Sequence, residues 1–525
     1  MAFLLFQSGS SLQCINQSGT LSTLTLPTGV TLQTDRPPRF AVYGRFVVMT
    51  NTPTVPITVD ADGICRVLTP KAPEFPIVLD DDGGAGNLTG DYFAWQTYII
   101  RDESGNLIAE SDYSPDMPVA FTASSDLLNA ESLNVSQEAV SASRIYRSTA
   151  GGTAKFRWLD VDGTSQTTSD NDDTADATLD NITGPTLGSA PDLILVANWR
   201  ERLWGVDRVD VDALRFTEAG VMYSWPAANE RIVGREGSDK RGITALLARR
   251  DALGVGRREG LFQVTGTSNT DLRVVIVSEQ CGVESQETVI VWKDIAYFLW
   301  KDGVYAWGPE GLQCISDGKV RAWFTTDTYF NRGRFQYAFA GIDPINNKYR
   351  LFLANTGDSV ENRWVEYDIK EKTWWGPHKT DAVTTLTCAT LMPDSNDNFQ
   401  ALIGNSTGYF WKDQTTATDD TATGIALDVD TKFYDGNTPD IEKYWGELSM
   451  LGKAQSAGTL TITPKVGWLN ASTGTAISYT MSNGRQRLRR LGMGKLMQLN
   501  LTHSTAAQPV ELYGLSIPFH EIGRR

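Results

Sequence analysis

Apolar and polar residues alternate along most of this chain, and helical spacing is nearly absent. Where the alternation stops, short apolar runs rich in Val, Ile, Phe, Tyr and Trp replace it, which is typical of β-strands. Turn-forming stretches such as DADG, KDG, PINNK and PDSNDN separate these runs. Residues 124–143 are the one stretch with a helical look, and they are equally compatible with strand and loop. The pattern therefore predicts an all-β protein.

The groups of strands recur at intervals of 45 to 50 residues. Their starts lie near Leu193, Ile243, Thr288, Gln336 and Val383, and an earlier group of the same shape starts at Arg39. Such a period is typical of β-propeller blades, because one small sheet buries its two apolar faces only by stacking against its neighbours. We therefore expect a propeller of about six blades, one of them completed by the N-terminal strands. A set of unrelated β-sandwich pieces is the alternative.

Two segments do not follow the repeat. Residues 72–190 contain alternating strands and Gly-containing turns, which predict an immunoglobulin- or fibronectin-like β-sandwich inserted between blades. Strands after residue 442 predict a second, C-terminal β-domain. The expected domains are 1–71 (N-terminal strands and first blade), 72–190 (insert), 191–442 (remaining blades) and 443–525 (C-terminal domain).

The net charge of −16 is unevenly distributed. Residues 72–190 hold 20 acidic and 5 basic side chains, whereas residues 443–525 hold 3 acidic and 10 basic ones. This asymmetry indicates separate bodies with different neighbours. We expect the acidic insert and the basic C-terminal domain to meet surfaces of opposite charge, on each other in adjacent subunits or on neighbouring proteins. A chain this acidic is unsuited to wrapping DNA on a basic groove.

An acidic run in the insert is a candidate calcium loop. Asp170, Asp172, Asp173 and Asp176 lie within the stretch DNDDTAD. Ca²⁺ prefers several carboxylates on one loop, but the EF-hand spacing is absent here. A solvated loop without a metal is therefore the favoured interpretation, with calcium as the alternative.

A basic run in the C-terminal domain is a candidate contact surface. The stretch RQRLRR carries Arg485, Arg487, Arg489 and Arg490. Its alternation with Gln and Leu predicts an exposed strand or a face against another subunit or partner, in preference to nucleic-acid contact.

Enzyme signatures are absent from the sequence. It contains no GxxxxGK[ST], HExxH or GxSxG motif, and GVGRREG at 254–260 is followed by an apolar strand, which predicts a hairpin turn. The three histidines and five scattered cysteines form no metal-ligand pattern, so we expect no cofactor and no metal centre. Two carboxylates of a glycosidase need only be close in space, and the sequence nominates no such pair.

The cysteines and the apolar runs bear on localisation. Five cysteines without a CxxC pair indicate reduced thiols in a protein assembled in a cytoplasm. No apolar run reaches the roughly 18 residues of a membrane helix. The opening MAFLLFQSGSS lacks a basic region and a cleavage site. We therefore expect neither membrane insertion nor a signal peptide.

Several phrases in order resemble a known family. They are NWRERLWGVD, LRFTEAGVMYSWP, ITALLARRDALGVGRREGLFQVTG and DGVYAWGPEGLQCIS in the propeller, RIYRSTAGGTAKFRWLDV in the insert and VELYGLSIPF near the end. From about residue 39 onward the chain resembles the propeller-bearing tail nozzle, or tail-hub, proteins of short-tailed bacteriophages.

This resemblance implies a structural virion protein of the tail, made and assembled in the cytoplasm of a host bacterium and not an enzyme. It implies a homo-hexamer that forms a tube below the portal and its adaptor protein, with tail-fibre or tail-tip proteins alongside. DNA would leave the capsid through the lumen without specific binding, since an acidic wall repels phosphate. The alternatives are a receptor- or carbohydrate-binding propeller adhesin of the tail, exposing Trp and Tyr on one face, and a propeller hydrolase.

Overall fold

The chain folds almost entirely into small antiparallel sheets. In the part of the chain that the structure describes, helix is limited to α1 (Ala322–Thr325) and the 3-10 turns η1 (Asp176–Thr178), η2 (Gln286–Thr288), η3 (Arg332–Tyr337) and η4 (Met481–Asn483). This computed structural model describes residues 3–16, 18–34, 36–52, 55–101, 104–134, 140–162, 172–183, 188–234, 242–379, 385–393, 398–412, 419–420, 423–424, 427–467, 472–505, 508 and 510–522. The all-β prediction is confirmed.

The chain divides into two compact units. The first comprises residues 1–378 and 385–412, and the second comprises residues 379–384 and 413–525. The first unit contains a β-propeller and the inserted sandwich, and the second contains the C-terminal β-domain.

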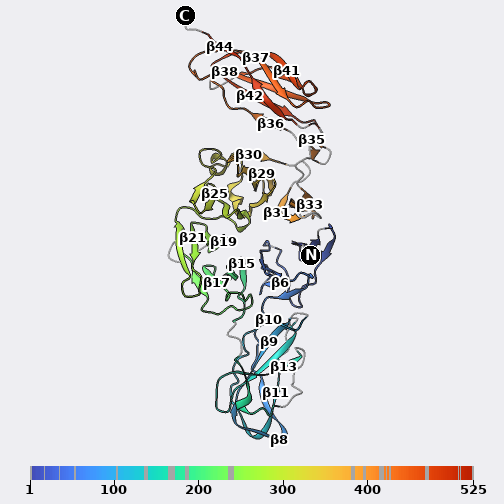
Figure 1. Cartoon of the computed structure of the whole chain (residues 1–525), viewed down its shortest axis with the longest axis vertical. Coiled ribbons are helices and arrows are strands. Elements are labelled where there is room, and N and C mark those ends of the chain that lie inside the picture. The colour runs from blue at the N-terminus through green and yellow to red at the C-terminus, as the bar shows by residue number, and fades with distance from the viewer. Residues whose placement is uncertain are drawn as a thin grey trace. The chain divides into compact units, whose positions relative to one another are not determined.

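Seven sheets form the propeller among the described residues (Figure 1). The first three are β1 (Phe3–Ser8), β2 (Ser11–Asn16), β3 (Leu21–Thr23); β4 (Phe40–Tyr43), β5 (Phe46–Met49), β6 (Ile57–Val59), β7 (Cys65–Val67); and β15 (Leu193–Trp199), β16 (Arg202–Asp207), β17 (Ala213–Phe216), β18 (Glu230–Ile232). The next two are β19 (Ile243–Ala248), β20 (Leu253–Arg257), β21 (Gly260–Thr265), β22 (Arg273–Ser278); and β23 (Ile290–Trp292), β24 (Ile295–Trp300), β25 (Gly303–Gly308), β26 (Gly311–Cys314). The last two are β27 (Phe339–Asp343), β28 (Lys348–Ala354), β29 (Glu361–Asp368), β30 (Thr373–His378); and β31 (Leu386–Pro393), β32 (Phe399–Asn405), β33 (Phe410–Lys412).

The blades meet one another in a closed circle. The first strands of neighbouring sheets contact each other in the order β4, β15, β19, β23, β27, β31. The N-terminal sheet fills the remaining place, because Phe6 packs edge-on against Phe410 with ring centroids 4.8 Å apart and Leu5 shares a core with Ile57 of the following sheet. The repeat alone indicated about six blades. The ring counts seven sheets because β1–β3 form a sheet of their own and do not complete another blade.

Aromatic side chains fill the wedges between blades, as the repeat predicted. Trp204 is fully buried, stacks on Phe216 of its own blade with ring centroids 4.6 Å apart, and shares a core with Ile243 and Leu253 of the next blade. Trp307 lies so close to Gly254 of the preceding blade that a Cβ there would approach its ring to 2.6 Å. A side chain at Gly254 would therefore force two blades apart.

The insert lies between β7 and β15 and is a two-sheet sandwich. Its five-stranded sheet has the order β10-β9-β12-β13-β14, and its second sheet pairs β11 with β8. The strands are β8 (Val78–Tyr92), β9 (Ala94–Arg101), β10 (Leu107–Glu110), β11 (Phe121–Glu131), β12 (Ala142–Arg147), β13 (Phe156–Asp162) and β14 (Asp180–Thr183). The start of the stretch 124–143, which had a helical look, is thus strand β11.

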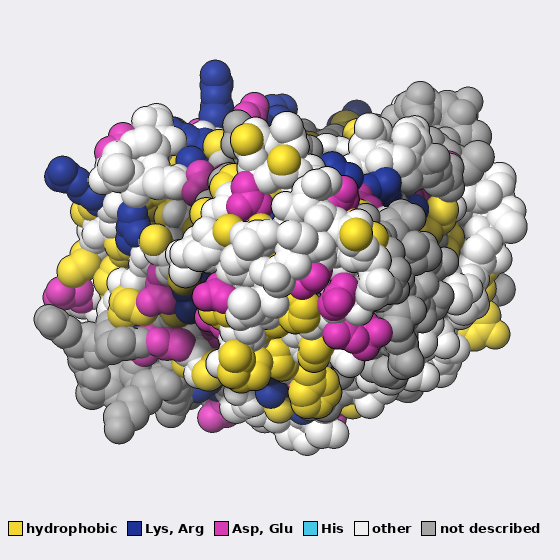
Figure 2. Space-filling view, turned by 90° about the horizontal axis from the view of Figure 1, so that it is seen from below, with side chains coloured by type: hydrophobic (Ala, Val, Ile, Leu, Met, Phe, Trp, Pro, Cys, Tyr) yellow, Lys and Arg dark blue, Asp and Glu magenta, His cyan; other side chains and the backbone are white. Residues whose placement is uncertain are grey.

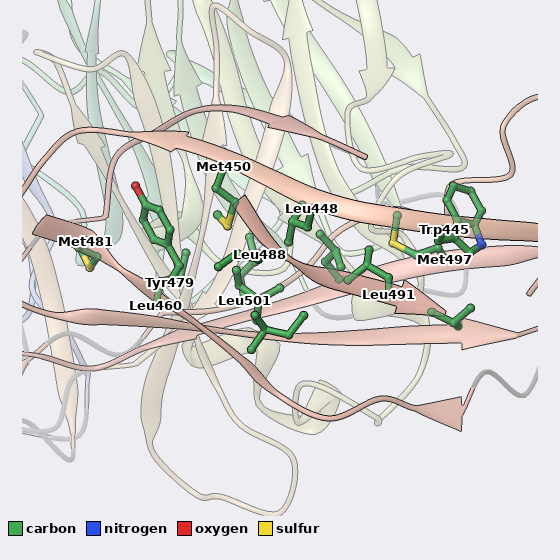
Figure 3. Packing of buried hydrophobic residues seen from close by; sticks show 14 residues of the cluster. Trp445, Leu448, Met450, Leu460, Tyr479, Met481, Leu488, Leu491, Met497 and Leu501 are labelled. Carbon is green, nitrogen blue, oxygen red and sulfur yellow. The ribbon is translucent and has the colours of Figure 1, made fainter. Parts of the chain in front are cut away.

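The C-terminal unit is a second sandwich around one apolar core (Figure 3), which includes Trp445, Leu448 and Leu501. One sheet joins β36 (Leu427–Asp430), β42 (Leu496–His503), β38 (Thr459–Gly467), β39 (Ser472–Thr473) and β40 (Ile477–Thr480); the other joins β41 (Arg485–Gly494), β37 (Lys443–Gly452), β43 (Leu512–Ser516) and β44 (Phe519–Glu521). A short ladder of β34 (Asp419–Asp420) and β35 (Thr423–Gly424) precedes them. Because β36 pairs with β42, this domain begins before residue 443, where the sequence had placed its boundary.

Candidate functional site

The acidic loop of the insert surrounds a buried arginine. The Arg147 side chain on β12 is fully buried, and its Nε donates to the equally buried carboxylate of Asp172. Its Nη1 donates to Asp176 Oδ1 at 2.8 Å, and its Nη2 donates to the carbonyl of Thr174. The guanidinium also lies over the ring of Tyr92, 5.3 Å from its centroid. The loop therefore supplies the negative charge that a buried guanidinium requires.

The described carboxylates of this loop, which the sequence offered as an alternative calcium site, have partners within the protein. The carboxylates of Asp172 and Asp176 are engaged by Arg147, and Asp173 accepts hydrogen bonds from the backbone and side chain of Asn87 at 2.6 and 2.7 Å. Asp170 lies outside the described residues. Within the described ranges, no cluster of His, Cys, Asp and Glu is arranged to hold a metal ion. A cation is already present in the loop, and it is an arginine.

The basic run of the C-terminal domain lies on an exposed strand, as predicted. We call Arg485, Arg487, Arg489 and Arg490 of β41 the arginine strand; all four are exposed. β41 is the edge strand of its sheet and pairs only with β37 in the described part of the chain. Its register shifts between Glu447 and Ser449, so β41 carries one extra residue there. Such a bulge lets consecutive side chains reach solvent, and it explains how neighbouring Arg489 and Arg490 are both exposed.

The arginine strand makes few contacts of its own. Arg489 donates to the carbonyl of Thr475 at 2.7 Å, and Arg490 donates to the hydroxyl of Tyr444 at 3.3 Å. Within the described residues, none of the four guanidinium groups forms an ion pair with a carboxylate. The strand therefore offers uncompensated positive charge to a partner.

An ion pair crosses the axis of the propeller, and sequence reasoning did not find it. Arg39 directly precedes β4, and its guanidinium pairs with the carboxylate of Glu287 in η2, just before β23. In the circle of sheets, the blades of β4 and β23 lie on opposite sides. Ser285 Oγ also donates to Glu287 Oε2 at 2.6 Å. No local pattern in the sequence marks this pair, since its members meet only when the ring closes.

One pocket of the propeller lies beside the β20–β21 and β24–β25 turns. It has a volume of about 250 Å³ and is lined by Arg258, Glu259, Glu284, Lys301, Arg332 and Phe335. Four of its five charged side chains form ion pairs, with Arg258 3.0 Å from Glu284 and Lys301 3.1 Å from Glu259, and Arg332 donates to the carbonyl of Lys301. The pocket has the polarity to accept a small polar group such as a sugar hydroxyl.

The cysteines are free thiols, as expected from their spacing. Burial raises the pKa of Cys281 and of Cys388, and burial with the nearby Asp60 raises that of Cys65 to about 11. Because the thiolate is the reactive form, these three side chains are poor nucleophiles at neutral pH.

The fold and these surfaces define a class: an all-β propeller protein that carries an acidic and a basic sandwich module. Among the described residues, no helix is both long and apolar enough to cross a membrane. No protein-family model matches the chain, nor does any curated protein sequence.

Comparison with solved structures gives distant matches. AztD from Citrobacter koseri is 11% identical with a TM-score of 0.30, and the alignment covers 78% of this chain and 93% of AztD. The extracellular domain of a putative one-component system from B. thetaiotaomicron is 10% identical with a TM-score of 0.24, covering 94% of this chain and 80% of that one. An exo-β-1,3-galactanase from Phanerochaete chrysosporium is 8% identical with a TM-score of 0.18, covering 82% and 100%. The fold assignment therefore rests on the sheets of this chain itself.

Proposed function

We propose that this chain is a structural component of a short-tailed bacteriophage tail, a nozzle or hub protein that assembles with copies of itself into a ring or tube for genome passage. The observation that carries the proposal is the separation of opposite charge onto two β-modules of a chain that also contains a propeller. Among the described residues, exposed carboxylates without an ion pair lie on strand β8 of the insert and exposed guanidinium groups without an ion pair lie on β41. Such charge complementarity orients subunits and speeds their encounter. The ordered phrases that resemble the nozzle family support the same proposal.

Because side chains close the axis of the propeller, the conduit of the proposed assembly would lie between chains and not within one chain. The Arg39–Glu287 pair spans the circle of blades, so a duplex does not pass through a single propeller. In the proposed assembly, the lumen is bounded by several chains, a homo-hexamer in the resembled family. Portal-adaptor and tail-fibre or tail-tip proteins would be its neighbours in the virion.

A tail adhesin is the second candidate, and exposed aromatic residues favour it. Trp375 and Tyr409 are 55% and 67% exposed, and Tyr337 is 56% exposed. Aromatic rings at a surface pair an apolar face with a polar edge and are common at binding sites. Most other tryptophans of the described chain are buried or half-buried, many of them within blades. Aromatic side chains therefore serve mainly to pack the propeller.

Electron microscopy of the purified full-length protein separates the two candidates. The nozzle proposal predicts sixfold rings or tubes with a central hole wide enough for a DNA duplex, and light scattering should give the mass of six chains. Particles that remain monomeric at every concentration and are retained on a glycan array would overturn it in favour of the adhesin. A solution control with the Trp375→Ala variant should leave ring formation unchanged, because Trp375 is outside both charged modules.

A further inference from the structure

Four of the ten basic side chains of residues 443–525 lie on one strand, β41. Lys453 and Lys465 form ion pairs of 3.0 Å with Glu511 and Asp430. Lys443 is buried and donates to backbone carbonyls. The arginine strand, by contrast, has no carboxylate partner among the described residues. Within the described part of the domain, the arginine strand is therefore a group of exposed basic side chains without carboxylate partners, at one edge of the sandwich.

The sheet around the arginine strand also exposes apolar side chains. Leu451 pairs in register with Arg485 and is 46% exposed, and Met493 pairs with Tyr444 and is 61% exposed. Arginine beside Met and aromatic residues is the composition enriched in protein–protein interfaces. An exposed carboxylate, Glu447, stands in register with Arg490 on the same sheet. Glu447 offsets part of the charge of Arg490, so the uncompensated charge is greatest at Arg485 and Arg487, which pair with Leu451 and Ser449.

The insert has the complementary excess. Each of its five basic side chains already pairs within the insert, namely Arg101, Arg144, Arg147, Lys155 and Arg157. Asp80, Asp81 and Asp91 of β8 are exposed and form no ion pair with any described residue. β8 is also an edge strand, because β11 is its only partner in the described part of the insert. Figure 2 shows acidic side chains interspersed with apolar ones across the middle of one face of the molecule.

We propose that the arginine strand of one copy binds the acidic strand β8 of a second copy. Two edge strands with opposite and uncompensated charge meet, and guanidinium groups donate paired hydrogen bonds to carboxylates. The apolar side chains beside the arginines become buried in the contact. This contact rests on the proposed assembly of several copies and names the surfaces that hold neighbouring copies together.

Charge reversal in the full-length chain tests the contact. The arginine variant carries Arg485→Glu and Arg487→Glu. These two arginines were chosen because their side chains form no hydrogen bond with any described residue. The acid variant carries Asp80→Lys, Asp81→Lys and Asp91→Lys. Sedimentation velocity at low salt should show a rise of at least about tenfold in the apparent Kd for self-association of either variant. A chain with all five substitutions should associate within about threefold of the wild type, because the two charges are exchanged.

Controls keep the outcomes distinct. Reversal of the exposed propeller residues Lys370 and Lys372 to Glu should leave association unchanged, and circular dichroism should confirm that every variant is folded.

If the arginine variant associates as the wild type does, the proposed contact is overturned while the proposed rings are not. Reduced association without rescue by the five-substitution chain also overturns it. Loss of binding to a short DNA duplex with unchanged self-association assigns the strand to nucleic acid instead. A wild type that never self-associates overturns the contact together with the proposed function.

Discussion

At the scale of single residues, the buried side chain of Arg147 links strand β12 of the insert to the acidic loop. Arg147 is a cation without access to water, and Asp172, Asp176 and a backbone carbonyl satisfy its donors. A loop that looks like a metal site from its acidic composition is therefore a counter-charge for an arginine. The carboxylates can be identified in the sequence, but their distance from Arg147 is known only from the structure.

Asp172→Asn should destabilise the insert by about 3–5 kcal/mol, since the substitution leaves a buried guanidinium with too little negative charge. Amide hydrogen exchange in β12 measures this loss within the insert itself. The matched control is Asp173→Asn, at an exposed carboxylate, where a change below about 1 kcal/mol is expected. Addition of EDTA should leave exchange in β12 of the wild type unchanged; protection that falls with EDTA and returns with Ca²⁺ would contradict this account.

His378 should make the stability of the propeller depend on pH. Burial lowers the pKa of His378, with Lys348 and Arg350 adding to the effect and Glu366 opposing it. Its Nε2 is buried without a hydrogen-bond partner in the described structure, and its ring lies 5.4 Å from that of Trp364. Because the pKa is lower in the folded state, the unfolded chain takes up the proton first. The neutral form of His378 therefore makes its full contribution to the free energy of unfolding above about pH 6.5. This contribution is lost as the pH falls through the folded-state pKa.

His378→Phe keeps the ring and removes the titration. Urea unfolding between pH 7.5 and 5 should therefore show a smaller fall in the midpoint for the variant than for the wild type. His520→Phe, at an exposed histidine, is the matched control and should behave like the wild type. If the urea midpoint falls equally with pH in the wild type and in the His378 variant, this histidine is not the source of the pH dependence.

At the scale of elements, the propeller depends on contacts between blades that are distant in sequence. The Arg39–Glu287 pair joins the start of β4 to η2, across the circle of sheets. Burial lowers the pKa of Arg39, while Glu287 counteracts this effect. The pair therefore links two blades that are not neighbours in the ring.

Glu287→Gln should lower the stability of the propeller by about 1–3 kcal/mol, because a partly buried guanidinium loses its counter-charge. Thermal unfolding followed by tryptophan fluorescence measures the change. Glu371→Gln removes an exposed carboxylate from a solvent-accessible pair with Lys370 and should have almost no effect. Equal losses for the two variants would show that the position of Glu287 on the axis has no special role.

The hairpin at 254–260 illustrates what the sequence could and could not predict about an element. Its pattern correctly predicted two strands and a tight turn, now β20 and β21. The reason for Gly254 is not local, because the ring of Trp307 in the next blade occupies the space of its missing side chain. Likewise, hydrophobic patterning predicted that β41 is exposed, whereas the bulge that presents Arg489 and Arg490 together depends on pairing with β37.

For the whole molecule, assembly should be sensitive to salt. Interactions between opposite charges at exposed surfaces weaken when the Debye length falls from about 10 Å at 0.1 M to about 3 Å at 1 M salt. Sedimentation velocity of the wild-type protein should therefore show a larger assembled fraction at 0.05 M than at 0.5 M NaCl. A matched series in a non-ionic osmolyte separates screening from general solvent effects. Association that is indifferent to salt would contradict the role given to the charged modules.

The sequence by itself determined the all-β class, the repeated blades, the inserted and terminal β-modules and the opposite charges of those modules. These properties follow from the alternation, turn residues and composition of short segments, which act locally. Tertiary structure alone decided that the N-terminal strands form a seventh sheet, that Arg147 occupies the acidic loop and that Arg39 meets Glu287 across the axis. These outcomes depend on distances between residues far apart in the chain, and only the closing of the ring and of the sandwich sets those distances.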